Sequence, residues 1–524
     1  METAERVEQP SGKNRLSLEE KVARMCVIGV PSTRIDAETT ERFVAMPFGG
    51  LGIFPHNIES EAQLENWVAS ADRLTAAKHE AKPYYLSIDE EGGSLSNMKA
   101  FFPYVPSNRA VGLAESERIA HEHGKLIGSQ LYSIGIPMNW APVLDVNTSI
   151  DNPVVGIRSF GEDSDTVARL GAAYIAGMHE AGVACTAKHF PGHGQVSGDS
   201  HIELQTCELD IEELIAGPLI PFRKAIDAGV DSIMLAHIVF PNIPESQGWP
   251  ASLSRYFATE LLRDKLGFQG VICTDDIEMG AIKNNYEPAE IGVMAVLAGN
   301  DMIVMCHTPH FQNDVMSGIV RAVRDGVIPE ERIDESITRI EELQARMAAY
   351  RASASPVPRE QWKERILALA RETVKLAVDP QQMVPLLKSK RYLLVVPKLE
   401  RQSKADNSDG KGLPLAGLLA DRGIHLTEIS ISQNPDVNEQ KRVADHAAGF
   451  DAVIQGTINA HLFEGQAQLA HTLAQHKPLL AVILRNPYDT GVLPEQASQA
   501  LLCSTSDYSL IALAERLVPR GGIA

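Results

Sequence analysis

The stretch VACTAKH, residues 183–189, is the clearest of a set of similar segments that together indicate the fold. It is short, rich in apolar and β-branched residues, and ends in two polar side chains, which is typical of a strand of a parallel sheet. Longer helical patterns separate the segments, as crossover helices would. Seven more lie before residue 310: MCVIGV (25–30), GGLGIF (49–54), YYLSID (84–89), PMNWAPV (137–143), DSIMLAH (231–237), GVICTD (270–275) and DMIVMCH (301–307).

Eight strand-and-helix units predict an α/β fold of the (β/α)8 TIM-barrel type. In such a barrel the chemistry takes place at the C-terminal ends of the strands, so polar residues that close the strands are candidates for the site. Six residues hold such positions: Asp89, Asp145, His189, His237, Asp275 and His307.

A second domain follows the predicted barrel. The stretch RASASPVPREQ is small, polar and rich in proline, as linkers are. We therefore expect a catalytic barrel over 1–350, a linker over 351–361, and a smaller αβα sandwich over 362–524 that serves as an accessory domain. The polar residues 400–411 are expected to form a mobile loop. Four segments predict the strands of the sandwich: YLLVVP (392–397), IHLTEISI (424–431), DAVIQG (451–456) and LLAVILR (479–485).

Composition limits the class of protein and its partners. The 524 residues are 44% hydrophobic and 22% charged, which is typical of a folded globular chain. A formal net charge of −20 argues against nucleic acid and anionic membranes as partners. Neither an apolar signal-peptide core nor an apolar run of about 18 residues occurs, so we expect a cytoplasmic protein. Six cysteines without CxxC spacing predict neither disulfides nor a zinc ribbon. The oligomeric state stays open.

The loop after the fifth strand, AKHFPGHGQVSGDSH (187–201), carries the densest chemistry. Asp199 and His201 are one residue apart, so their side chains can face the same way and form a hydrogen bond. The carboxylate would orient the imidazole and favour its protonated form, leaving the other ring nitrogen to exchange a proton with a leaving-group oxygen. The pair is predicted to be an acid/base dyad.

The segment CTDDIEMGA, residues 273–281, ends the seventh strand with two aspartates. Strand alternation would send them to opposite faces, so only one is expected to face the barrel mouth. A carboxylate there can attack an anomeric carbon and form a glycosyl-enzyme. We assign this role to Asp275, and we expect Asp276 to cap the following helix.

The segments KHFPGHG, DSH and TDDIEM resemble glycoside hydrolase family 3, in particular its bacterial β-N-acetylglucosaminidase branch. SIDEEGG (87–93), APVLDV (141–146), NPVVGIRSFGED (152–163), SIMLAHIVFP (232–241) and ASLSRYFATELLRDKLGFQGVICTDD (251–276) extend the resemblance in order over about 350 residues. More weakly, RNPYDTG (485–491) resembles the αβα domain that some members carry.

The resemblance implies a retaining enzyme that removes terminal β-linked N-acetylglucosamine from cell-wall or chitin-type fragments, as in peptidoglycan recycling. The enzyme's partner would be a small carbohydrate substrate, and the resemblance implies neither a cofactor nor a metal. Carried over to this sequence, it makes Asp275 the nucleophile, His201 the general acid/base and Asp199 its partner. Sugar hydroxyls would be bound by Asp89, Arg158, Lys188 and His189.

One position departs from the family pattern. The family usually continues this segment as GGRVxR, whereas here Gly93 is followed by Ser94, and Asn97 stands at the place of the second arginine. Losing a guanidinium removes a charged bidentate donor, so a β-glycosidase for a different sugar is one alternative. A second is a β-N-acetylglucosaminide phosphorylase, because an imidazole acid would not repel phosphate as a carboxylate does.

Three other classes of protein compete with these. A metal-dependent hydrolase could use His189, His193, Asp199 and His201 as ligands, although barrel metal ligands usually come from several strands. An aldolase could use Lys188 as a Schiff-base lysine. A sugar-binding protein that has lost activity is the third, against which the intact nucleophile and dyad argue.

Overall fold

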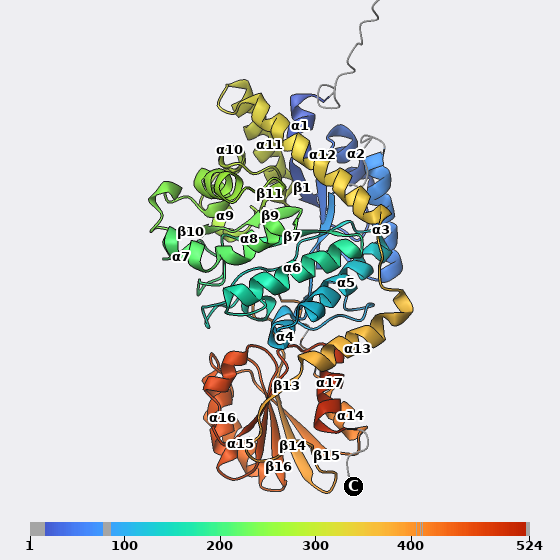
Figure 1. Cartoon of the computed structure of the whole chain (residues 1–524), viewed down its shortest axis with the longest axis vertical. Helices are drawn as coiled ribbons and strands as arrows, with labels where there is room; N and C mark the ends of the chain where they lie inside the picture. Colours follow the sequence, from blue (N-terminus) through green and yellow to red (C-terminus); the bar gives the residue numbers. More distant parts are fainter. Residues whose placement is uncertain (1–15, 77–84, 405, 409, 411, 520–524) are drawn as a thin grey trace, which may run out of the picture.

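The computed structural model describes residues 16–76, 85–404, 406–408, 410 and 412–519, and it contains a barrel above a separate sheet (Figure 1). All eight predicted segments hold barrel strands, which run parallel and pair in chain order, and the last, β12, pairs with the first, β1. A parallel bridge between Cys273 and Met302 closes the ring, confirming the TIM barrel. The strands are β1 (Cys26–Gly29), β2 (Gly50–Ile53), β3 (Tyr85–Ile88), β6 (Met138–Asn139), β7 (Ala184–Phe190), β9 (Ser232–Leu235), β11 (Val271–Thr274) and β12 (Ile303–Met305).

Helices surround the barrel, and several begin at a side-chain cap. Ser17 and Glu20 form a capping box, while Asp36 and Asp163 accept hydrogen bonds from backbone amides of the first turn. One helix, η6 (Tyr256–Lys265), has the wider π-helical turn. The α-helices are α1 (Leu18–Arg24), α2 (Ala37–Ala45), α3 (Glu61–Ala76), α4 (Asn108–Ala114), α5 (Glu117–Ile134), α6 (Ser164–Glu180), α7 (Ile211–Ala216), α8 (Leu219–Asp227), α9 (Gly280–Lys283), α10 (Pro288–Ala298), α11 (Pro309–Arg324) and α12 (Glu330–Ala352).

Apolar side chains of the barrel strands form the main core together with the surrounding helices. Val27, Leu51, Leu86, Ile233 and Ile303 are buried on five different strands and belong to one apolar cluster with the surrounding helices. Each such side chain stabilises the fold by about 1.5–3 kcal/mol relative to exposure. Short strands at the mouth complete the barrel: β4 (Glu90–Gly92), β5 (Leu95–Ser96), β8 (Gln205–Thr206) and β10 (Ile238–Val239).

The second sheet has six strands in the order β13-β18-β17-β16-β14-β15, all parallel except the edge strand β13. Helices α14 and α17 cover one face, and α15 and α16 cover the other, which confirms the αβα sandwich (Figure 1). Strands β13 and β18 were not predicted. The elements are α13 (Trp362–Thr373), β13 (Lys375–Val378), β14 (Arg391–Pro397), α14 (Leu415–Ala420), β15 (His425–Ile431), α15 (Val437–Ala447), β16 (Ala452–Thr457), α16 (Glu464–Ala474), β17 (Leu479–Ile483), β18 (Ser498–Leu501) and α17 (Asp507–Leu517).

Helix α13 joins the barrel to the sandwich. Trp362 and Ile366 pack into the apolar cluster of the barrel, whereas Ala370, one turn later, packs into that of the sandwich. Because one helix packs into both clusters, it marks no sharp border between the domains, and the predicted domain boundaries at residues 350 and 362 stay a prediction. In the described part of the chain, no helix is both long and apolar enough to cross a membrane.

Candidate active site

A pocket of about 260 Å³ opens at the C-terminal ends of the barrel strands. Six of the seven residues predicted from the sequence line it, and the seventh, Asp199, contacts one of those six. The aromatic side chains of Phe54 and Trp140 form part of the pocket wall. Such rings are common in sugar-binding sites because they pack against the apolar face of a pyranose. The six are Asp89, Arg158, Lys188, His189, His201 and Asp275.

Asp275 directly follows strand β11 and is held by the backbone. Its Oδ1 accepts a hydrogen bond of 2.8 Å from the amide of Asp276, and its own amide donates to the carbonyl of Leu235. Burial favours the neutral acid, but the imidazoles of His189, His237 and His201 outweigh it and hold the pKa of Asp275 at about 2. At neutral pH the carboxylate is therefore ionised, as a nucleophile must be.

Asp276 corrects two expectations. It lines the pocket together with Asp275, and its Oδ2 lies 2.9 Å from His307 Nε2. Strand alternation does not apply here, because both aspartates lie beyond the last residue of β11. Asp276 also does not cap α9, which begins at Gly280 after Met279; instead, its Oδ1 accepts from the amide of Glu278 and closes a turn.

Asp199 and His201 form the predicted hydrogen-bonded pair. His201 Nδ1 lies 2.7 Å from Asp199 Oδ1, and the His201 amide donates to the same oxygen at 2.8 Å. Burial raises the pKa of Asp199, but the hydrogen bond from His201 outweighs it, and the net shift is downward. An ionised Asp199 occupies Nδ1, so Nε2 is the ring nitrogen left to exchange a proton with a bound molecule.

The loop carrying this pair is anchored to the element that follows Asp275. The carbonyls of His201 and Ser200 accept hydrogen bonds from the amides of Gly280 and Ala281, at the start of α9. Ser200 Oγ also lies 2.9 Å from His193 Nε2. These contacts join the segment after β11 to the loop after β7. They hold Asp275, the candidate nucleophile, in a fixed position relative to the Asp199 and His201 pair.

Two buried cations are fixed by a carboxylate that the sequence analysis did not select. Glu91 accepts two hydrogen bonds of 2.8 Å from the guanidinium of Arg158, and it lies 2.7 Å from Lys188 Nζ. Lys188 also pairs with Asp89 at 2.5 Å. Burial raises the pKa of Glu91, but Arg158 and Lys188 outweigh it and bring the value to about 2. Its place in SIDEEGG, two residues after Asp89, was the signal available.

Asp145 orients His189 in the same way. It is fully buried, its Oδ2 lies 2.7 Å from His189 Nδ1, and its Oδ1 accepts from the amide of His193 at 2.7 Å. The sequence analysis placed Asp145 at a strand end but gave it no role. Its contacts hold the imidazole of His189 at the pocket wall through a carboxylate that cannot itself reach solvent.

The four proposed metal ligands do not converge within the described residues. His193 Nε2 and His201 Nδ1 are occupied by Ser200 and Asp199, and no three of the four residues have ligand atoms that all lie within 4.8 Å of one another.

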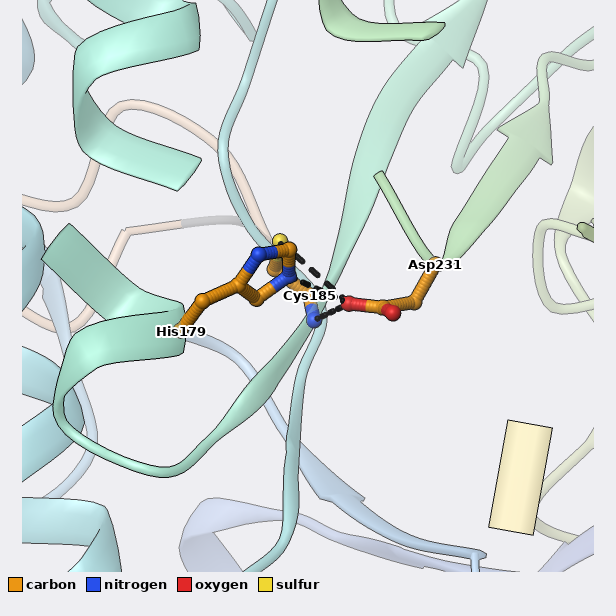
Figure 2. Close-up of side chains that lie close together, drawn as sticks. All are labelled: His179, Cys185 and Asp231. Carbon is orange, nitrogen blue, oxygen red and sulfur yellow. Dashed lines mark hydrogen bonds and ion pairs between the residues drawn. The ribbon is translucent and has the colours of Figure 1, made fainter. Parts of the chain in front are cut away.

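The one such group in the described part lies at the opposite end of the barrel, where His179 of α6, Cys185 of β7 and Asp231 before β9 meet (Figure 2). Asp231 Oδ2 lies 2.7 Å from His179 Nε2 and accepts from the amide of Cys185, and its other oxygen pairs with Arg346. This cluster links α6, β7 and α12 at the N-terminal ends of the strands, the end of a TIM barrel at which residues stabilise the fold and take no part in catalysis.

Glu90, which stands between Asp89 and Glu91 in the sequence, yields a prediction about stability. It is buried, and its Oε2 accepts from the amides of Asn97 and Met98. Burial raises its pKa from 4.5 to about 7. The folded protein therefore holds this proton more tightly than the unfolded chain, whose glutamate has a pKa of about 4.5. The contribution of Glu90 to the free energy of unfolding is fully present below pH 4.5 and is lost as the pH rises to about 7.

Replacing Glu90 with glutamine removes this titration and keeps an acceptor. The free energy of unfolding of Glu90→Gln minus that of wild type is expected to increase by on the order of 3 kcal/mol between pH 4.5 and 7.5. Urea unfolding of both proteins at several pH values measures it, and taking the difference cancels other titrating groups. A difference that is constant with pH would contradict the prediction.

Comparisons with known proteins extend over both domains. Residues 17–343 match the family model described as the glycosyl hydrolase family 3 N-terminal domain. A beta-hexosaminidase of Xylella fastidiosa (strain 9a5c) is 34% identical over 304 residues, 56% of this chain and 87% of that protein. A beta-hexosaminidase of Idiomarina loihiensis is 35% identical over 285 residues, 54% of this chain and 83% of that protein. The solved family 3 beta-N-acetylglucosaminidase of Paenibacillus sp. str. FPU-7 is 33% identical, with a TM-score of 0.89 and 97% of each chain covered.

Proposed function

The chain belongs to glycoside hydrolase family 3, and on this basis we propose that Asp275, His201 and Asp199 are the catalytic residues of a retaining β-N-acetylglucosaminidase. The resemblance seen in the sequence is thus confirmed, and the chain is a glycoside hydrolase of the β-N-acetylhexosaminidase type. The observation that carries the assignment of residues is their geometry: an ionised, half-buried carboxylate shares a pocket with an imidazole oriented by a second carboxylate.

The reaction takes two steps. In the first, the Asp275 carboxylate attacks the anomeric carbon, the glycosidic C–O bond breaks, and His201 Nε2 gives its proton to the leaving oxygen. In the second, a water molecule gives a proton to His201 and attacks the glycosyl ester, which releases the sugar and restores the Asp275 carboxylate. Two displacements at the same carbon retain the β configuration. Asp199 stabilises the imidazolium that carries the proton between them.

Four residues are proposed to hold the sugar. Asp89, Arg158, Lys188 and His189 line the pocket, and all except Asp89 are buried. Their partners, Glu91 and Asp145, keep them in one position before the substrate arrives. Fixed charged groups form strong hydrogen bonds to hydroxyls and need no reorganisation when charge develops in the transition state.

We propose cell-wall or chitin-type fragments as the natural substrate, a role in peptidoglycan recycling, and action in the cytoplasm. All six cysteines lie in the described part, buried and free, which suits a reducing compartment. Separating cell fractions and following the protein with an antibody tests the location, and recovery outside the cytoplasmic fraction would contradict it.

A panel of nitrophenyl β-glycosides tests the activity. The N-acetylglucosaminide is expected to be turned over faster than the glucoside, galactoside or N-acetylgalactosaminide, with free β-N-acetylglucosamine as the first product. Adding phosphate is expected to leave the product unchanged. Formation of a sugar 1-phosphate would instead support the phosphorylase alternative, and preference for another glycoside would support the alternative of a different sugar.

A further inference from the structure

The catalytic pocket includes two residues of the second domain. Lys404 and Asn407 belong to the segment between β14 and α14 of the sandwich, yet they line the pocket beside Asp89 and Asn97. The sequence analysis gave this domain no residue of the site and expected only a mobile loop there. The segment does lack helix and strand in its described residues, as predicted for a loop.

Two hydrogen bonds of its backbone hold Asn407 against the barrel. Its amide donates to the carbonyl of Ser94 at 2.8 Å, and its carbonyl accepts from Lys99 Nζ at 2.5 Å. The neighbouring Asp406 is buried and pairs with Arg485 at 2.6 Å, within the sandwich. None of these contacts uses the Asn407 side chain, so all of them can persist when that side chain is replaced.

The side chain of Asn97 is already committed to protein partners. Its Nδ2 donates to the carbonyl of Asp89, and its Oδ1 accepts from Asn407 Nδ2 at 2.7 Å. Asn407 keeps an unused Oδ1 and a second N–H, since neither has a hydrogen-bond partner among the described residues. At this edge of the pocket, Asn407 therefore offers a ligand an amide oxygen without a protein partner as well as an N–H, whereas the Oδ1 of Asn97 already accepts from Asn407.

Lys404 differs from the other cations of the pocket. Lys188 and Arg158 are buried and paired with Asp89 and Glu91, whereas Lys404 is exposed and has no ion-pair or hydrogen-bond partner among the described residues. An ammonium at the wall of a sugar pocket can donate up to three hydrogen bonds to hydroxyl or amide oxygens. Its long flexible stem lets it reach a ligand that the rigid buried cations do not contact.

We propose that Lys404 and Asn407 bind the sugar in the catalytic pocket and determine which sugar is accepted, so that the second domain completes the specificity site of the barrel. The inference rests on the proposed function. Asn407 would contact a sugar hydroxyl or the N-acetyl group through its free amide atoms, and Lys404 would donate to a neighbouring oxygen. Among the described residues, neither side chain forms a hydrogen bond or ion pair with Asp275 or His201, so both would act on binding and not on the chemical steps.

Steady-state kinetics with the nitrophenyl N-acetylglucosaminide test the proposal. Asn407→Ala and Lys404→Ala are each expected to raise KM about tenfold, the loss of one hydrogen bond to a ligand, with kcat within about twofold of wild type. Lys398→Ala is the matched control, because Lys398 is an exposed lysine of the same segment that does not line the pocket. The ratio of kcat/KM between the N-acetylglucosaminide and the glucoside should change in the two variants but not in the control.

Calorimetric binding of free N-acetylglucosamine adds a measurement that needs no turnover, and thermal unfolding checks that each variant is folded. If wild type binds the sugar but cleaves no glycoside, and the two variants bind about tenfold more weakly, the proposed function fails while this inference holds. If both variants match Lys398→Ala in KM, selectivity and sugar affinity, the inference is overturned. The same conclusion follows if wild type does not bind the sugar.

Discussion

Replacing Asp275 with alanine is expected to lower kcat/KM for the N-acetylglucosaminide by about 10⁴-fold to 10⁶-fold, the range seen when a central catalytic group is removed. The carboxylate is the only group in the proposed mechanism that forms a bond to the anomeric carbon. Its low pKa, about 2, means that it is already ionised throughout the neutral range. Release of nitrophenol under conditions of excess enzyme measures the remaining rate.

The neighbouring Asp276 offers a matched control for this experiment. Asp276→Asn also removes one negative charge from the pocket, but it keeps an acceptor for the amide of Glu278. It weakens the contact with His307, so a loss of about tenfold is expected. Comparable losses in the two variants would show that charge at the strand end matters more than the identity of the nucleophile, and the assignment of Asp275 would then be wrong.

Replacing His201 with alanine is expected to have an effect that depends on the leaving group. A methyl or sugar leaving group needs a proton, so kcat/KM should fall by about 10²-fold to 10⁴-fold, the usual contribution of a general acid. A dinitrophenyl group leaves as a stable anion, so its release should be slowed far less. Asp199→Asn should show the same pattern with a smaller loss, because the imidazole remains but lacks its ionised partner.

Added azide separates the two roles of His201. In His201→Ala the glycosyl-enzyme waits for a water molecule that no base activates, whereas azide needs no base. Azide should therefore accelerate turnover of the dinitrophenyl glycoside and give the β-glycosyl azide, and it should have no such effect on wild type. An equal loss for good and poor leaving groups, without a response to azide, would rule out His201 as the acid/base.

The barrel and the pocket residues that close its strands were predictable because their information is local. Each strand is one short apolar segment, and in a parallel barrel all C-terminal ends meet at one rim. A polar residue at the end of such a segment, such as Asp275 or His189, is therefore placed at the rim, and this prediction does not require knowing which strands are adjacent in the barrel. The Asp199 and His201 pair was predictable for the same reason, since the two residues are one position apart.

The partners of these residues were decided only by the tertiary structure. Glu91 holds Arg158 across 67 positions of the chain, and Asn407 meets Asn97 across 310. No periodicity or spacing relates residues so far apart, because their contact depends on how whole elements pack and on how the sandwich docks on the barrel mouth. The position of Asp276 could not be predicted either, although it is next to Asp275. Strand alternation predicts opposite faces for the two side chains, but it no longer applies beyond the end of β11 at Thr274. Local sequence patterns were enough to predict the fold and the chemical groups of the site, whereas packing determined which of these groups are paired, buried or left free for a sugar.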